Sequence, residues 1–112
     1  MTQDEKLKHT IEALYIDALR GNSIYAWIIL ALLSYCNKPM NISTIAKTIK
    51  NKWPQTYNAI KKLHNLKLIH EITIGKRKYY IINDKIRKYV IGKLTLKDKE
   101  AIMRILKECG YA

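Results

Sequence analysis

Hydrogen-bonding and cationic side chains are interleaved with apolar ones in residues 51–82, NKWPQTYNAIKKLHNLKLIHEITIGKRKYYII. The first half of this stretch carries amide, phenol and ammonium groups at Gln55, Tyr57, Asn58, Lys61 and Lys62. The second half carries a basic cluster at Lys76, Arg77 and Lys78. Amides can pair with adenine edges, and cations can pair with guanine or with phosphate. These residue types therefore favour noncovalent recognition of a polyanion.

The sequence contains no signature of catalysis. It has no nucleophile elbow, phosphate loop, HExxH motif or paired catalytic carboxylates, so we expect the protein not to be an enzyme. His9, His64 and His70 lack metal-ligand spacing relative to one another and to Cys36 and Cys109, so we expect no metal and no other cofactor. The two cysteines also lack CxxC spacing, which predicts reduced thiols in a cytoplasmic protein.

The charge distribution supports a polyanionic partner. The 112 residues carry a formal net charge of +12, and between Lys38 and Lys93 the only acids are Glu71 and Asp84. Nucleic acid is the first candidate and an acidic membrane surface the second. The apolar run 24–36 is shorter than the ~20 residues that span a bilayer, so it predicts a core helix, and we expect no membrane association.

Hydrophobic spacing predicts a mainly helical chain with one small hairpin. The expected helices cover residues 3–20, 24–36, 42–49, 54–66, 84–91 and 96–109. Expected N-caps are Ser23, Asn41, Asn83 or Asp84, and Thr95. Gly92 and Gly110 are expected to end the last two helices.

The hairpin is predicted from a change of period after Ile69. Gly75-Lys76 suits a two-residue type II′ turn with glycine at its first central position. This register places Ile72 opposite Tyr79 on one face and Thr73 opposite Lys78 on the other, and we expect one face to be buried.

The helix before the hairpin has one apolar side. A rotation of ~100° per residue turns four side chains inward, namely Thr56, Ala59, Ile60 and Leu63. The polar groups of Asn58, Lys61 and Lys62 then point outward, flanked by Gln55 and Tyr57. A short helix, a tight connection, a second helix and a basic hairpin together predict a winged helix-turn-helix fold, with additional helices at both termini.

Residues 40–69, MNISTIAKTIKNKWPQTYNAIKKLHNLKLI, resemble the core of MarR-type transcription regulators. Ile45-Ala46 matches the Leu-Ala of the family's first motif helix, Leu63 its late buried leucine, and Leu68-Ile69 the start of its wing. Lys67 stands where the family usually has glycine. The resemblance implies base-facing roles for Gln55, Tyr57, Asn58 and Lys61 or Lys62. It implies backbone contacts from Ser43, Lys52, Lys76 and Arg77.

These observations lead to one principal hypothesis, a sequence-specific regulator that binds double-stranded DNA as a homodimer on an inverted repeat. We favour repression of transcription over activation, which the sequence leaves open. We expect a single domain with an N-terminal helix at 1–22, a winged-helix core at 23–83 and C-terminal helices at 84–112. The terminal helices either cover the core or join in a dimer interface, which we favour. Nothing in the sequence specifies a small-molecule effector.

An alternative hypothesis is a winged-helix module that contacts RNA or protein in a replication or transcription complex. Trp53 and Tyr57 would then provide the contact surface, because bases or a partner can stack on them. The same aromatic residues, with His64, can also pack as an edge of the core. The richness in isoleucine, lysine and tyrosine, without phenylalanine, is compatible with an AT-rich archaeal or viral genome.

Overall fold

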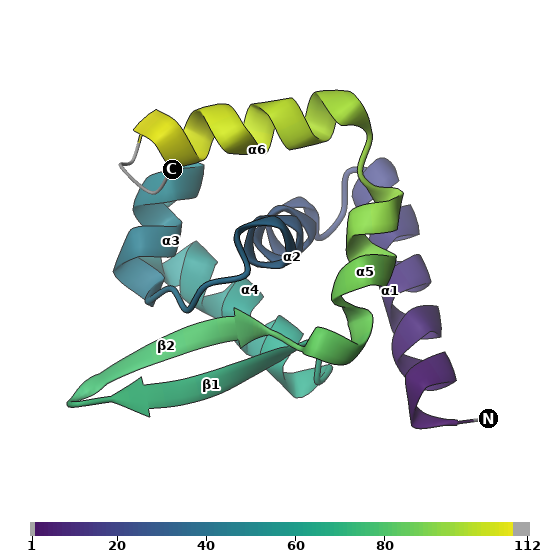
Figure 1. The fold of residues 1–112 in the computed structure, drawn as a ribbon, viewed down its shortest axis with the longest axis horizontal. Coiled ribbons are helices and arrows are strands. Elements are labelled where there is room, and N and C mark those ends of the chain that lie inside the picture. Colours follow the sequence, from purple (N-terminus) through teal and green to yellow (C-terminus); the bar gives the residue numbers. More distant parts are fainter. Residues whose placement is uncertain (1, 109–112) are drawn as a thin grey trace.

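The computed structural model describes residues 2–108, which form helices around a central helix with a hairpin projecting from one side (Figure 1). In chain order the elements are α1 (Gln3–Leu19), α2 (Ile24–Cys36), α3 (Ile42–Ile49), α4 (Trp53–Asn65), β1 (Ile69–Ile74), β2 (Arg77–Ile82), α5 (Asp84–Lys93) and α6 (Leu96–Glu108). The predicted fold class, mainly α with a small hairpin in a winged helix arrangement, is confirmed.

The central helix is α2, the most apolar segment of the chain. Its side chains Ile29, Leu30 and Leu33 are fully buried, and α1, α4, α5 and β2 all pack against it. The predicted core helix is therefore confirmed. Within residues 2–108, every helix is too short or too polar to span a membrane.

Three of the predicted caps form as expected. At the start of α5, the Asn83 Oδ1 atom accepts a hydrogen bond from the Lys85 N–H at 3.1 Å. The Asn41 Oδ1 atom accepts a hydrogen bond from the Thr44 N–H at 2.8 Å at the start of α3. Before α6, the Thr95 hydroxyl accepts from the Asp98 N–H at 3.1 Å, while the Asp98 carboxylate accepts from the Thr95 N–H at 2.9 Å. This reciprocal pair is a capping box, which satisfies two N–H groups that the helix leaves without partners.

One predicted capping contact and one predicted helix end are wrong. Ser23 directly precedes α2, as predicted, and its carbonyl accepts from the Trp27 N–H at 3.1 Å, but its backbone is left-handed (φ 54°) and among the described residues its side chain makes no capping hydrogen bond. Its hydroxyl instead accepts a hydrogen bond from Lys62 Nζ at 2.6 Å. Gly92 lies inside α5, which continues to Lys93, because Val90 anchors the helix in the core and Lys93 pairs with Glu12 of α1.

The helix pair α3–α4 packs as its apolar pattern predicted. Ile45 of α3 is fully buried, and so are Thr56, Ile60 and Leu63 of α4. Pro54 lies in the first turn of α4, where its missing N–H breaks no helical hydrogen bond. The inward face of α4 is therefore confirmed.

The hairpin has the predicted register, with Ile72 opposite Tyr79 and Thr73 opposite Lys78. Gly75 takes φ +64°, as its place in the turn requires. Only the base of the hairpin is buried, through Ile69, Tyr80 and Ile82, which are at most 5% exposed. These three share the face of Thr73 and Lys78, whereas Ile72 and Ile74 on the opposite face are 36% and 57% exposed.

One residue outside the two strands also pairs with the hairpin, a contact that the sequence did not predict. Met40, just before α3, exchanges two backbone hydrogen bonds with Tyr80, from Met40 N to Tyr80 O at 3.0 Å and from Tyr80 N to Met40 O at 2.8 Å. Met40 is fully buried. The bridge ties the hairpin to the start of the helix-turn-helix.

The junction between α4 and β1 is a Schellman motif. The Leu68 N–H donates to the Leu63 carbonyl at 3.1 Å, and the Lys67 N–H donates to the His64 carbonyl at 3.0 Å. Lys67 takes φ +63°, the left-handed conformation for which glycine is usually selected. Asn83 follows β2 at the base of the hairpin. It donates its backbone N–H to the Leu68 carbonyl at 3.0 Å and its side-chain amide to the Lys67 carbonyl at 3.1 Å.

The terminal helices cover different sides of the core. Leu7, Ile11 and Leu14 of α1 are buried where that helix packs on α2 and α5, whereas α6 buries Leu106 near α2 and α3 (Figure 1). These stripes therefore cap the domain's own core, and dimerisation through the terminal helices stays a prediction. Two residues named in the sequence predictions, Cys109 and Gly110, lie outside the described range.

Candidate nucleic-acid interface

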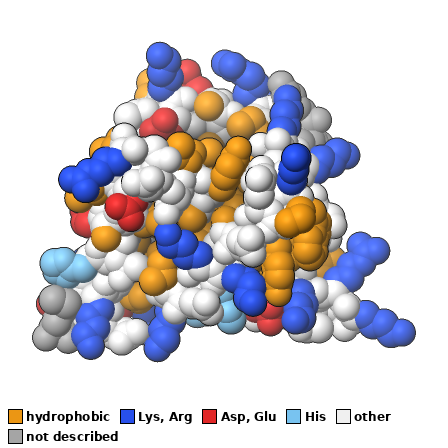
Figure 2. All heavy atoms as spheres, turned by 180° about the vertical axis from the view of Figure 1, so that it is seen from behind, with side chains coloured by type: hydrophobic (Ala, Val, Ile, Leu, Met, Phe, Trp, Pro, Cys, Tyr) orange, Lys and Arg blue, Asp and Glu red, His pale blue; other side chains and the backbone are white. Residues whose placement is uncertain are grey.

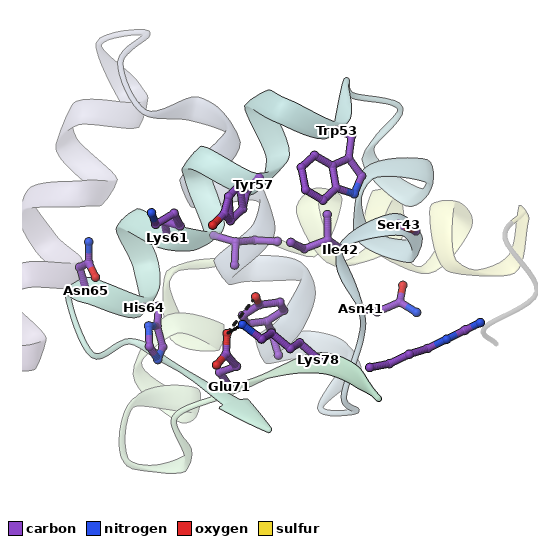
Figure 3. A pocket seen from close by; sticks show the side chains of 13 residues that line it. Asn41, Ile42, Ser43, Trp53, Tyr57, Lys61, His64, Asn65, Glu71 and Lys78 are labelled. Carbon is purple, nitrogen blue, oxygen red and sulfur yellow. Dashed lines mark hydrogen bonds and ion pairs between the residues drawn. The ribbon is translucent and has the colours of Figure 1, made fainter. Parts of the chain in front are cut away.

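A groove with a volume of about 980 Å³ separates α4 from the hairpin (Figure 3). One wall is formed by α4 and the beginning of α3, and the other by the two strands. Its lining residues are Asn41, Ile42, Ser43, Trp53, Tyr57, Ile60, Lys61, His64, Asn65, Glu71, Arg77, Lys78 and Tyr80. The groove brings side chains from opposite ends of the 41–80 stretch together.

Half of the predicted contact residues meet in this groove, namely Ser43, Tyr57, Lys61, Arg77 and Lys78. The other half lie outside it, namely Lys52, Gln55, Asn58, Lys62 and Lys76. Lys52 is the N-cap residue of α4, and Lys76 is in the hairpin turn. Gln55 and Asn58 are exposed on α4, and Lys62 turns toward Ser23 at the start of α2. The predicted set is therefore spread across the groove, the exposed side of α4 and the hairpin tip.

An aromatic pair stands on the α4 wall. The Trp53 and Tyr57 ring centroids are 5.3 Å apart with an angle of 34° between the planes, and the Lys61 Nζ atom lies 5.3 Å from the Tyr57 centroid. Trp53 is 50% exposed and Tyr57 is half-buried. Trp53 thus forms part of the groove wall and is not an edge of the core.

A carboxylate on the hairpin wall is held by two neighbours. The Tyr80 hydroxyl donates a hydrogen bond to Glu71 Oε1 at 3.2 Å, and Lys78 Nζ lies 3.9 Å from the same oxygen (Figure 3). Burial of the phenol, and secondly its bond to the Glu71 carboxylate, raise the pKa of Tyr80 to about 12. Tyr80 therefore stays protonated and keeps donating to Glu71 at neutral pH.

Sequence reasoning missed five polar or titratable lining residues, Asn41, His64, Asn65, Glu71 and Tyr80. The predicted register already placed Glu71 and Tyr80 opposite each other, on the face of Thr73 and Lys78. That pairing was the available signal for a carboxylate in the groove.

The surroundings of the groove are basic. Seen from behind, Lys and Arg side chains lie both at the edges of the face and between its apolar side chains, and they outnumber the acidic ones (Figure 2). Across residues 2–108, no three His, Cys, Asp or Glu side chains are grouped so that they could hold a metal ion. The described surface thus offers cationic, amide and aromatic groups for noncovalent contact.

A family profile for the TBPIP/Hop2 winged helix domain matches residues 26–83. The chain belongs to this family. The matched range is just over half of the chain and runs from α2 to Asn83 after β2, so this winged helix domain contains the whole groove. No curated protein and no solved structure gives a significant match. The winged helix predicted from the sequence is confirmed, whereas the MarR-type resemblance is not and stays a prediction.

Proposed function

We propose that this winged helix domain binds double-stranded DNA through α4 and the hairpin, and that it has no catalytic activity. The observation that carries the proposal is the position of Arg77 and Lys78 on one wall of a groove whose other wall is α4, with its exposed amide and ammonium groups. The major groove of B-form DNA is about 12 Å wide and admits an α-helix. A basic two-stranded arm beside that helix can then reach the adjoining phosphates or minor groove.

Each part of the surface has a distinct role in this arrangement. Asn58 and Lys61 project from the exposed side of α4 and read base edges. Lys52, at the beginning of α4, and Arg77 neutralise phosphates, which position the protein without reading sequence. The beginning of α4 also suits an anion, because a helix N-terminus presents free N–H groups and a partial positive charge.

Transcriptional repression by a homodimer on an inverted repeat is the finer proposal. Two recognition helices must lie about 34 Å apart to read successive major grooves on the same face of a DNA duplex. A second copy would supply the second helix, and the candidate interface is formed by the exposed sides of the terminal helices, opposite the stripes that pack on the core. Analytical ultracentrifugation and the stoichiometry on a selected site test this part, and a monomer that binds one chain per site contradicts it.

Fluorescence anisotropy on a labelled duplex, from low to physiological salt, tests DNA binding itself. We expect log K to fall with log salt by about 0.9 for each phosphate neutralised. Arg77→Ala should weaken binding to all sequences and reduce the slope by about 1, whereas Asn58→Ala should relax sequence preference. Lys88→Ala is the matched control, because Lys88 is an exposed cation on α5, away from the groove. A salt-independent affinity would refute the proposal.

The half-exposed Trp53 favours a second candidate function, contact with RNA or with a protein partner. Exposed indoles are frequent anchors in protein interfaces and stacking platforms for unpaired bases. Binding to single-stranded RNA or to a protein, in the absence of duplex binding, would support this candidate.

A further inference from the structure

Trp53 is placed where neither core packing nor duplex binding explains it. It is the first residue of α4, lines the groove and is 50% exposed. Large aromatic side chains usually gain most from burial. A paired base in the major groove offers only its edge, so an indole face cannot stack on it.

The pair formed by Trp53 and Tyr57 is arranged as a stacking platform. Tyr57 packs at 5.3 Å from the indole centroid, and Lys61 lies over the Tyr57 ring, so both aromatic side chains are supported from within the groove. Aromatic rings and cations side by side are typical of surfaces that bind single strands, because bases stack on the rings and phosphates meet the cations.

The opposite wall provides partners for the rest of a nucleotide. Arg77 and Lys78 can meet its phosphate, and the groove volume of about 980 Å³ lies at the upper end of the ~300–1,000 Å³ that small-ligand sites occupy. Lys78 is 67% exposed at its side chain, so its pairing with Glu71 leaves it accessible to a phosphate.

Glu71 adds selectivity between bases. A carboxylate beside phosphates is unfavourable unless it meets a donor, and base amino groups are such donors. Tyr80 and Lys78 hold Glu71 through Oε1. Adenine, cytosine and guanine each carry an amino group on the pairing edge, whereas thymine carries only a ring N–H group there, between two carbonyl oxygens that a carboxylate repels.

We propose that this groove accepts an unpaired base stacked on Trp53, so that the domain prefers duplex DNA that carries a single-stranded extension. The preferred extension contains bases with an amino group (cytosine, adenine or guanine) in place of thymine. The inference rests on the proposed duplex binding and names the DNA structure that the same site selects.

The test compares a blunt duplex with the same duplex carrying an extension of five cytosines, five thymines or five abasic sites. Wild-type protein should bind the cytosine extension about tenfold more tightly than the blunt duplex, the scale of one base–aromatic stack. The abasic extension should give no gain. Trp53→Ala should abolish the gain, so that this variant binds the extended and the blunt duplex equally, and Trp53→Phe should retain part of the gain. Glu71→Gln should reduce the preference for cytosine over thymine.

The matched control is Tyr25→Ala, because Tyr25 is an aromatic side chain with similar exposure (46%) outside the groove. Equal affinity for blunt and extended duplexes overturns the inference while the proposed function stands. A gain that survives Trp53→Ala, or that the abasic extension also gives, assigns the preference to the basic side chains and overturns it too. Failure to bind any duplex overturns both the inference and the proposed function. Binding to a protein partner without binding to DNA would also overturn both.

Discussion

Replacing Lys67 with glycine should stabilise the protein. Lys67 takes φ +63° at the Schellman end of α4, and a left-handed backbone costs a residue with a Cβ atom roughly 1–2 kcal/mol. Glycine removes that cost but gives the unfolded chain more entropy, which offsets about 0.4–1 kcal/mol. The net expectation is a gain of about 0.5–1 kcal/mol in the free energy of unfolding, or about 2–6 °C in Tm.

Urea denaturation of wild type and Lys67→Gly should show a higher midpoint with an unchanged slope. Lys47→Gly is the matched control, because Lys47 is an exposed lysine in the last turn of α3 with a right-handed helical backbone, where glycine should cost up to about 1 kcal/mol. If Lys67→Gly destabilises the protein as Lys47→Gly does, the left-handed backbone at position 67 and the reasoning from it are refuted.

Three further predictions concern side-chain contacts. Asn83→Ala should lower the free energy of unfolding by about 1–2 kcal/mol in urea denaturation, because the buried Asn83 amide bonds α5 and the α4–β1 junction. The raised pKa of Tyr80 corresponds to about 2–3 kcal/mol of stability that is present below pH 10 and is lost between pH 10 and about 12. The difference in the free energy of unfolding between wild type and Tyr80→Phe should therefore change across that pH range. Bonds from Lys93, then Tyr89, lower the pKa of Glu12, so the extra stability of wild type over Glu12→Gln should be present above pH 4.5 and disappear as the pH falls further. Thermal unfolding as a function of pH checks the Tyr80 and Glu12 predictions, and differences from wild type that do not change with pH would contradict the assigned contacts.

The sequence predicted the features that depend on local pattern. Period and turn chemistry are local, so the helices, the Asn41 cap and the Gly75 turn followed from neighbouring residues. The Met40–Tyr80 bridge joins residues far apart in the chain and has no periodic signature. Gly92 shows the converse, since tertiary packing overrides a local stop signal.

The candidate site was only partly predictable for a similar reason. A helical wheel identifies the exposed arc of α4, but not which flank of that arc faces the hairpin. That choice depends on how the hairpin leaves the helix, and it places Tyr57 in the groove and turns Lys62 toward Ser23. Glu71 was visible in the sequence as an isolated acid, but its role as a groove residue required the buried face of the hairpin to be known.

The backbone fixes the hairpin to the helix-turn-helix at its base. Leu68 bonds both the end of α4 and Asn83, and Met40 pairs with Tyr80, so the base cannot swing without breaking buried hydrogen bonds. The tip is different, because Ile74 beside the turn is 57% exposed and contributes nothing to the core. Residues near the base, such as Glu71, are thus held at a set distance from α4, whereas Lys76 lies at the tip, away from these bonds. In the proposed complex with DNA, discrimination between bases should therefore depend on the base of the hairpin, and the sequence-independent part of the affinity on its tip.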